Sequence, residues 1–202
     1  MSDVGIDWDK GDGLVPAIVQ HWQSGAVLML GYMNATALAQ TQQTGKVTFY
    51  SRSKARLWTK GETSGHFLVF KSMRIDCDND TLLIQAEPQG PTCHQGTQSC
   101  FGDEAAPPLT FLAELDALIG QRERDRPAGS YTTKLFDQGL RRIAQKVGEE
   151  GVEIALAAVA QDDAALRGEA ADLIFHLLVL LRARGLDLAQ VVAELQRRHS
   201  SS

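Results

Sequence analysis

Residues 143–160 read IAQKVGEEGVEIALAAVA, and their apolar side chains recur at the spacing of an α-helix. The apolar stripe begins before this segment and runs through it, at Phe136, Leu140, Ile143, Val147 and Ile154. The stripe skips Glu150, which has Glu149 and Glu153 close by on the helix. The stretch therefore predicts a helix whose apolar stripe faces the core, with acidic side chains in and beside that stripe.

Further helices are predicted on both sides of this segment. Four are expected in all: residues 109–120, a second from Thr132 or Thr133 to about Ala160 with a candidate kink at Gly148 and Gly151, a third from Asp162 to just before Gly185, and a fourth opened by Asp187. Short turns between helices are typical of a bundle or of half of an intertwined one.

The third predicted helix carries a second acidic group. Glu169 and Asp172 are three residues apart and share a face of the helix, and His176 follows four residues later on the same side. The surrounding residues 171–181, ADLIFHLLVLL, are apolar nearly all round. We therefore expect Asp172 and His176 to lie inside the bundle.

Carboxylates near a core are costly unless they are protonated, paired with Lys or Arg, or neutralised by a divalent cation. Their hard oxygens suit Mg²⁺, which commonly bridges protein acids to substrate phosphates. The sequence therefore predicts metal-assisted cleavage of a phosphoanhydride by water. The alternative is a charged helix surface held by ion pairs, with nearby cations supplied by Lys134, Arg141, Arg142 and Lys146.

The first half of the chain has a different character, and it holds all three cysteines and all three tryptophans. Short apolar runs predict strands at residues 14–20, 27–30, 47–50, 67–70 and 81–87, with one helix from Ala35 to about Gln43 that Asn34 caps. We predict a two-domain α+β chain. A β-rich domain, a compact sheet or barrel, covers residues 1–106 and an all-α bundle covers residues 107–202. The acidic connector GDEAAPP (residues 102–108) ends in two prolines.

Charge and apolar run length exclude several classes of protein. Twenty Lys plus Arg against 25 Asp plus Glu leave a net charge of −5, which argues against a nucleic-acid or anionic-membrane binder. No apolar run is long enough to span a bilayer, and the N-terminus lacks the pattern of a signal peptide, so we predict a cytoplasmic location. The odd number of cysteines predicts reduced thiols, free for packing or for a metal.

Residues 76–80, DCDND, place three acids at alternate positions just before a predicted strand. In an extended backbone Asp76, Asp78 and Asp80 point to one face and Cys77 points to the other. Cys93 and Cys100 follow in a loop-forming segment. Three thiolates would bind Zn²⁺ and leave a fourth position open for water, as in a catalytic zinc site.

Two other interpretations of these residues are open. Free cysteines commonly pack as small hydrophobic side chains. The three acids, together with Glu87, also fall at ligand positions of a calcium-binding helix–loop–helix motif. Against that motif, Thr81 stands where the loop needs glycine, and the flanks are predicted to be strands.

A basic segment separates two of the predicted strands. Residues 51–66 read SRSKARLWTKGETSGH, with the cations Arg52, Lys54, Arg56 and Lys60 and several hydroxyls. In an acidic protein such a cluster can grip phosphates. Trp58 either packs on a base or fills the core, and the core is the commoner role.

The helical half resembles a known family, the phosphoribosyl-ATP pyrophosphatases of the MazG-like superfamily. Three segments carry this resemblance: SYTTKL (residues 130–135), IAQKVGEEGVE (143–153) and EAADLIFHLLVLL (169–181). The similarity covers residues 110–200 and implies hydrolysis of phosphoribosyl-ATP to phosphoribosyl-AMP and pyrophosphate.

That resemblance also implies site residues for the helical half. Glu150 is the implied catalytic residue, and Lys134 or Lys146 lies near the substrate phosphates. The implied Mg²⁺ ligands are Glu149, Glu150, Glu153, Glu169 and Asp172.

Residues 14–102 are similar to the phosphoribosyl-AMP cyclohydrolases. The similarity rests on four segments: LMLGYMN (28–34), YSRSKARLWTKGETSGH (50–66), DCDNDTLL (76–83) and GPTCHQGTQSCF (90–101). It implies a zinc-dependent enzyme in which water attacks the adenine C6 of phosphoribosyl-AMP and opens the bond between N1 and C6.

The second resemblance implies a homodimer with a shared zinc site, in which Cys77 of one subunit meets Cys93 and Cys100 of the partner subunit. Asp76, Asp78 and Asp80 are the implied Mg²⁺ ligands. His94, beside a zinc ligand, is the candidate for proton transfer. The candidate substrate contacts are Arg52, Lys54, Lys60 and Ser64.

The product of one implied reaction is the substrate of the other, so the whole chain resembles the bifunctional enzymes of the second and third steps of histidine biosynthesis. The expected partners are these small-molecule substrates. Two other functions compete with this one: a zinc-dependent binding or regulatory module without turnover, and a generic nucleotide pyrophosphatase that uses only the second half.

Overall fold

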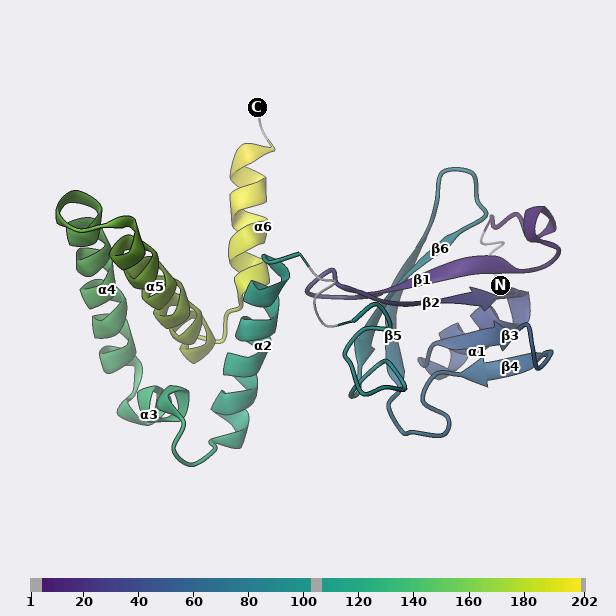
Figure 1. Ribbon diagram of the computed structural model, residues 1–202, viewed down its shortest axis with the longest axis horizontal. Helices are drawn as coiled ribbons and strands as arrows, with labels where there is room; N and C mark the ends of the chain where they lie inside the picture. The colour runs from purple at the N-terminus through teal and green to yellow at the C-terminus, as the bar shows by residue number, and fades with distance from the viewer. Residues whose placement is uncertain (1–4, 103–106, 201–202) are drawn as a thin grey trace. The chain divides into compact units, whose positions relative to one another are not determined.

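The computed structural model describes residues 5–102 and 107–200, so most of the predicted connector lies outside the described residues. The chain divides into two compact units, Met1–Thr110 and Phe111–Ser202. The first is β-rich and the second is helical (Figure 1). The predicted two-domain α+β architecture is confirmed. Among the described helices, none has the length and apolar character that crossing a bilayer requires.

A four-stranded sheet forms the centre of the first unit, with the strand order β2-β1-β6-β5. The central pair β1 and β6 is parallel, and both outer pairs are antiparallel. Strands were predicted at all four places, although β2 and β5 run longer than expected. Their bounds are β1 (Val15–His21), β2 (Val27–Met33), β5 (Leu68–Ile75) and β6 (Leu82–Pro88).

Helix α1 (Ala35–Thr44) packs against a two-stranded sheet of β3 (Thr48–Ser51) and β4 (Arg56–Thr59). Its predicted cap is confirmed, because the Asn34 side chain accepts a hydrogen bond from the Ala37 N–H at 2.8 Å. Strand β4 was not predicted, because the basic segment that contains it was interpreted as a phosphate-binding cluster.

Gly31 on β2 allows an aromatic side chain of β3 to approach the backbone closely. A Cβ atom at Gly31 would lie 2.4 Å from the Phe49 ring, so glycine is the residue that fits there. Phe49 is fully buried and stacks on Trp58 with ring centroids 5.6 Å apart. Trp58 is thereby held at the edge of the core, partly buried, and it also lines a surface pocket.

The second unit contains five helices within the described residues rather than the four predicted: α2 (Thr110–Asp125), α3 (Tyr131–Gln138), α4 (Leu140–Ala160), α5 (Asp163–Ala183) and α6 (Leu188–His199). The chain breaks at Gly139, where φ is 83°, a conformation that favours glycine. Helix α4 runs without interruption through Gly148 and Gly151, where a kink had been expected. Leu140 follows the break and is exposed, so it does not continue the core stripe.

Helices α4 and α5 pack side by side, and α3 contacts both (Figure 1). Their common core includes Leu135, Ile143, Leu178 and Val179. Side chains of Ser130, Asp162 and Asp187 cap the first turns of α3, α5 and α6. The predicted helix starts near Asp162 and Asp187 are thus confirmed.

A paired arginine and aspartate tie α2 to the helix that carries the second acidic group. Arg182 on α5 donates to both oxygens of Asp116 on α2, at 2.9 and 2.6 Å, and the pKa of Arg182 is raised chiefly by this contact. Asp116 also accepts from the Leu188 N–H at the start of α6, at 3.4 Å. Three helices therefore meet at one buried carboxylate.

The Asp116→Asn change removes the negative charge from this pair and leaves Arg182 without its counter-ion. We expect the free energy of unfolding of the helical unit to fall by about 2–3 kcal/mol, measured by urea denaturation with far-UV circular dichroism. The matched control is Glu194→Gln, because Glu194 makes only exposed pairs with Arg197 and Arg198. The control should change stability by less than about 1 kcal/mol, and an equal effect of both changes would contradict the assignment.

Candidate active sites

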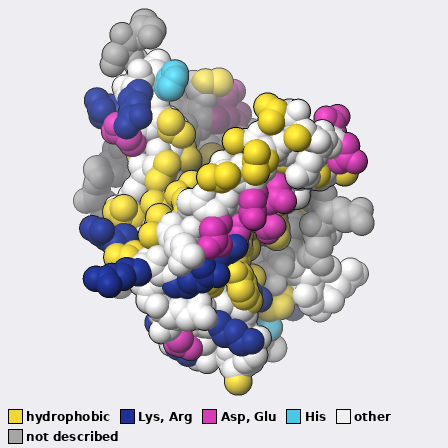
Figure 2. Space-filling view, turned by 90° about the vertical axis from the view of Figure 1, so that its left-hand side faces the viewer, with side chains coloured by type: hydrophobic (Ala, Val, Ile, Leu, Met, Phe, Trp, Pro, Cys, Tyr) yellow, Lys and Arg dark blue, Asp and Glu magenta, His cyan; other side chains and the backbone are white. Residues whose placement is uncertain are grey.

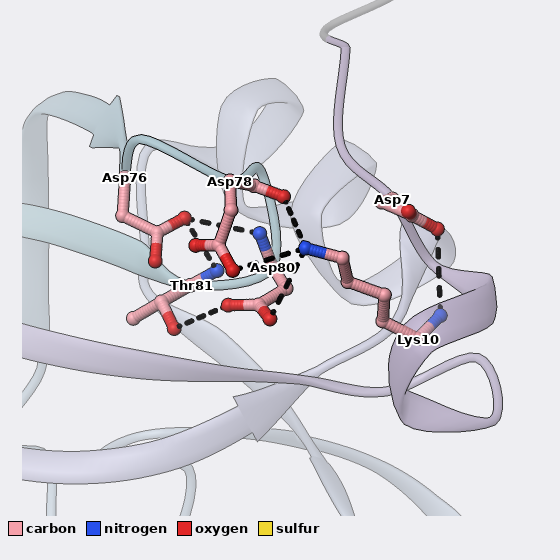
Figure 3. A network of polar contacts seen from close by, with 6 residues as sticks. All are labelled: Asp7, Lys10, Asp76, Asp78, Asp80 and Thr81. Carbon is pink, nitrogen blue, oxygen red and sulfur yellow. Dashed lines mark hydrogen bonds and ion pairs between the residues drawn. The ribbon is translucent and has the colours of Figure 1, made fainter.

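Three carboxylates gather in the turn that joins β5 to β6 (Figure 3). Oxygen atoms of Asp76, Asp78 and Asp80 all lie within 4.8 Å of one another, a geometry that could hold a metal ion. The sequence predicted this convergence but for the wrong reason. The backbone is a tight turn with φ of 65° at Asn79, not an extended strand. The flanking elements are strands, so the calcium-binding helix–loop–helix interpretation is excluded.

Backbone N–H groups hold the first of these acids in place. Asp76 Oδ1 accepts hydrogen bonds from the N–H groups of Asp80 and Thr81, each at 3.0 Å. Although desolvation opposes the shift, these N–H donors lower the pKa of Asp76 below its ordinary value. The carboxylate is therefore ionised and preorganised over the acidic range where an isolated aspartate begins to protonate.

The ammonium of Lys10 lies against the other two acids (Figure 3). Its Nζ is 3.0 Å from Asp78 Oδ2, 3.6 Å from Asp80 Oδ2 and 2.7 Å from the backbone oxygen of Asp78. The hydrogen bond to Asp78 is the largest cause that raises the pKa of Lys10. A cation from a distant part of the chain thus already partly neutralises the cluster.

Two of the three cysteines lie together in the loop after β6. The backbone anchors this loop to β2, because the Cys100 N–H donates to the Leu28 carbonyl at 2.8 Å and the Ser99 hydroxyl donates to the Val27 carbonyl at 2.8 Å. Hydrogen bonds from the N–H of Gln95 and from the Thr97 hydroxyl lower the pKa of Cys93. A hydrogen bond with Cys100 lowers it further. Partial burial raises the pKa of Cys100, with Cys93 adding to the shift.

Cys77 lies apart from this pair, in the acidic turn, and no three-residue ligand group of the described residues joins it to Cys93 and Cys100. All three thiols are free, and none is fully buried. The interpretation of the cysteines as small core residues is therefore not supported. The thiols instead form one pair and one separate ligand candidate on the surface of the unit.

A pocket of about 370 Å³ opens beside the Cys93 thiol. Among its lining residues are Trp58, Lys60, Ser64, His66, Cys93 and His94. The Lys60 side chain is nine-tenths buried, and within the described part of the chain no carboxylate lies at ion-pair distance from its ammonium. A buried cation without a counter-ion favours binding of an anion. The pocket therefore combines thiol, imidazole and an unpaired ammonium.

The remaining basic candidates lie elsewhere on the unit. Arg52 borders a second pocket, of about 360 Å³, with Tyr50, Ser51 and Ser53, and its guanidinium stacks on the Tyr32 ring 3.8 Å from the centroid. Trp58 lines both pockets. Lys54 is exposed in the β3–β4 turn, and it lines neither pocket.

The helical unit brings together acids from two helices. Carboxylate oxygens of Glu150 on α4 and of Glu169 and Asp172 on α5 lie within 4.8 Å of one another. Glu150 is buried, as the skipped position in the apolar stripe predicted, and His176 is buried as well.

Asp172 is exposed, so the prediction that it lies inside the bundle was wrong. The apolar residues around it on α5 do not all face the core. Figure 2 shows acidic side chains gathered on this face between hydrophobic and basic ones.

Lysine 146 sits between two glutamates of the same helix. Its Nζ is 2.6 Å from Glu150 Oε1 and 3.0 Å from Glu149 Oε2. The hydrogen bonds lower the pKa of both glutamates and raise that of Lys146. Glu153 shows the opposite shift, because its hydrogen bond with ionised Glu150 and its desolvation raise the pKa of Glu153.

Glu149 is not a member of the three-acid group. Its carboxylate binds Arg142 at 3.1 Å and Gln145 at 2.8 Å in addition to Lys146. Lys134 is exposed on α3, and no described carboxylate lies at ion-pair distance from its ammonium. The ion-paired surface weighed as an alternative therefore describes Glu149, whereas Glu150 belongs both to an ion pair and to the acidic group.

The buried imidazole of His176 lies next to the Glu150 carboxylate. His176 Nδ1 is 2.9 Å from the Asp172 carbonyl oxygen and 3.5 Å from Glu150 Oε1. The Tyr131 hydroxyl lies 3.1 Å from His176 Nε2. Because the carbonyl can only accept, His176 Nδ1 donates to it, and Nε2 shares a hydrogen bond with the Tyr131 hydroxyl. The carbonyl and the tyrosine together fix the orientation of this ring.

Sequence reasoning missed three side chains of these sites: Lys10, His66 and Tyr131. Lys10 is 68 residues from Asp78 along the chain, and nothing in either segment signals the contact. His66 meets the pocket because Gly90, with φ of 116°, leaves space for its ring. Tyr131 stands in the segment SYTTKL, from which only Lys134 was singled out as a site residue.

Comparison with known proteins matches each half of the chain to a separate family model. Residues 29–102 match the phosphoribosyl-AMP cyclohydrolase model, and residues 112–199 match the phosphoribosyl-ATP pyrophosphohydrolase model. The first match lies within the β-rich unit and the second within the helical unit. The acidic turn, the paired thiols and the helical acids therefore all lie inside matched segments.

Curated relatives match almost the entire chain. Proteins named "Histidine biosynthesis bifunctional protein HisIE" are 66% identical over 194 residues in Xanthomonas axonopodis pv. citri (strain 306), 63% over 201 residues in Xylella fastidiosa (strain Temecula1) and 60% over 194 residues in Escherichia coli (strain K12). These alignments cover 96–98% of this chain and 93–96% of the relatives. The chain belongs to the family of bifunctional histidine-biosynthesis proteins, in which a phosphoribosyl-AMP cyclohydrolase domain precedes a phosphoribosyl-ATP pyrophosphohydrolase domain.

Proposed function

We propose that the two units catalyse consecutive hydrolytic steps of histidine biosynthesis, each with its own metal-assisted site. The helical unit cleaves phosphoribosyl-ATP to phosphoribosyl-AMP and pyrophosphate, and the β-rich unit opens the adenine ring of phosphoribosyl-AMP. Both family models match and the relatives align along the whole chain, so neither a regulatory module without turnover nor a pyrophosphatase of the second half alone describes it.

The convergence of Glu150, Glu169 and Asp172 supports a magnesium site in the helical unit. Three hard oxygen ligands from two packed helices fit Mg²⁺, and Glu153 is close enough to Glu150 to join them. Magnesium there would neutralise the diphosphate and stabilise charge on the leaving pyrophosphate. Lys146 favours the ionised form of Glu150, and buried Glu150 would orient the attacking water. Exposed Lys134 is available to substrate phosphates.

The thiols of Cys93 and Cys100 support a zinc site in the β-rich unit, since paired soft ligands beside a pocket suit that metal. Zinc there would activate water near neutral pH. His94, whose Nδ1 is 3.8 Å from Cys93 Sγ, lines the same pocket and would transfer the proton. Lys60 and Ser64 line the pocket and would hold a substrate phosphate, while Arg52 would meet the substrate at the adjoining pocket. Asp76, Asp78 and Asp80 would bind a second Mg²⁺.

We further propose a homodimer that completes the zinc site with Cys77 of the partner subunit. Two thiols leave the zinc short of a ligand, and the third thiol of the same chain lies apart from them. Exposed apolar side chains also cover parts of α4 and α5 that a second copy would bury: Val152, Leu156, Val159, Ile174 and Leu177. The free thiols favour a reducing location such as the cytoplasm.

The change Glu150→Gln removes one charge from the three-acid group while keeping the side-chain shape. We expect Mg²⁺-dependent release of pyrophosphate from phosphoribosyl-ATP to fall roughly 100-fold or more. Ring opening of supplied phosphoribosyl-AMP should stay unchanged, since its site lies in the other unit. Glu194→Gln serves as the control and should keep both activities. Loss of both activities in a folded Glu150→Gln protein would contradict the two-site assignment.

The converse change is Cys93→Ser in the β-rich unit. A hydroxyl is a poor zinc ligand compared with a thiolate, so bound zinc, measured by elemental analysis, and ring opening should both be lost. Pyrophosphate release should persist at the level of the unaltered chain. A variant that keeps stoichiometric zinc together with full ring-opening activity would remove Cys93 from the site.

Subunit complementation tests the shared zinc site. Cys77→Ser and Cys93→Ser chains should each be inactive in ring opening when purified alone. Random mixing makes about half of the dimers heterodimers with one intact site of two, so coexpression should restore about a quarter of the normal activity. Full activity of Cys77→Ser alone, or no recovery on mixing, would show that the thiols are not shared between subunits.

A further inference from the structure

Lys10 makes the contacts with the acidic turn that a bound cation would make. Its ammonium lies within hydrogen-bond distance of one carboxylate oxygen and one carbonyl oxygen of Asp78 and near a carboxylate oxygen of Asp80 (Figure 3). The three oxygens belong to the same group of residues that converges within 4.8 Å. The chain therefore supplies a positive charge of its own to this cluster.

An ammonium and a divalent cation cannot share these oxygens. Mg²⁺ requires oxygen ligands at roughly 2.0–2.1 Å, so its approach to Asp78 and Asp80 would bring it next to the Lys10 nitrogen. Two positive charges at that separation repel strongly where solvent only partly screens them. Binding of the ion must therefore displace the lysine side chain from at least one carboxylate.

The surrounding structure allows this displacement at small cost. The backbone near Lys10 is held separately, because the Asp7 N–H donates to the Asn79 carbonyl at 2.7 Å and Ile6 and Trp8 pack against the core. The Lys10 side chain is about two-fifths exposed, so it can swing into solvent while its backbone stays in place.

The acidic turn also keeps its shape without the lysine. Its backbone geometry rests on the two N–H donors to Asp76 and on the Thr81 hydroxyl, which donates to Asp80 Oδ1 at 3.1 Å. None of these contacts involves Lys10. Removal of the ammonium therefore exposes a preformed set of oxygens rather than a disordered loop.

We propose that Lys10 is the internal counter-ion of the Asp76–Asp78–Asp80 cluster, that a divalent cation displaces it, and that this competition sets the affinity of the site for metal. The inference rests on the proposed magnesium site in the acidic turn and goes beyond it by assigning a residue that controls its occupancy. It makes the N-terminal segment part of the metal site of the β-rich unit.

The first test measures binding of Mn²⁺ to the full chain by electron paramagnetic resonance, as a substitute for Mg²⁺. Lys10→Met keeps the length of the side chain and removes the competing charge, so the cluster should bind Mn²⁺ roughly three- to tenfold more tightly. Lys10→Arg keeps the competitor and should bind Mn²⁺ no more tightly than the unaltered chain. In an Asp78→Asn background the gain from Lys10→Met should vanish, which separates this site from the helical one.

The matched control is Lys71→Met. Lys71 also pairs with an exposed carboxylate, that of Glu87, and its removal changes the net charge of the chain by the same amount. It should leave the Mn²⁺ affinity nearly unchanged. An equal gain in Lys10→Met and Lys71→Met would show a general charge effect and overturn the proposal.

The second test follows the lysine itself through its reactivity toward an amine-acetylating reagent, read by mass spectrometry. Saturating Mg²⁺ should increase acetylation of Lys10 severalfold, because the freed ammonium loses its carboxylate partners. Asp78→Asn should show high acetylation with or without Mg²⁺. Unchanged reactivity on saturation, or Mn²⁺ affinity that is equal or weaker in Lys10→Met, would overturn the inference while leaving the magnesium site standing. Absence of Mn²⁺ binding at the turn in every variant would overturn both.

Discussion

Mutual repulsion among carboxylates is the constraint that organises both halves of this protein. Each unit concentrates at least three acidic side chains within a few ångströms, which is unfavourable without positive charge nearby. In each unit a lysine supplies part of that charge: Lys10 at the acidic turn and Lys146 at the helical group. Neither lysine contacts all the acids of its cluster, so a net negative charge remains for a metal ion to neutralise.

The two lysines reach their acids by different routes. Lys146 is three and four residues before Glu149 and Glu150, so helix geometry alone brings them together. Lys10 depends on the packing of the N-terminal segment beside the β5–β6 turn. The first contact therefore survives wherever α4 forms, whereas the second requires the folded sheet. The Lys10 contact is therefore more sensitive than the Lys146 contact to changes in the packing of distant segments.

The sites also differ in how their ligands are supported. Rigid packing of α4 against α5 presents the helical acids, with His176 held behind Glu150 by the Asp172 carbonyl and Tyr131. In the β-rich unit the ligand candidates lie outside regular elements. A backbone hydrogen bond to β2 holds the loop of the paired thiols, and hydrogen bonds within the β5–β6 turn hold the acids. Because each unit has its own hydrophobic core, damage at one site need not disturb the other. The product of the helical unit is nevertheless the substrate of the β-rich one.

Local patterns in the sequence determined much of this protein: the two-domain division, the helix caps, the burial of Glu150 and the grouping of three acids in residues 76–80. Spacing along one element accounts for the helix caps and for the burial of Glu150. The two-domain division follows from composition, and the three acids converge through a turn rather than through the alternation of a strand. Tertiary structure alone decided that Asp172 stays exposed, that Cys77 lies apart from the other thiols and that Lys10 meets Asp78. Each of these depends on which distant segments pack together. Contacts between distant segments produce no repeating pattern in the sequence, so periodicity cannot predict them.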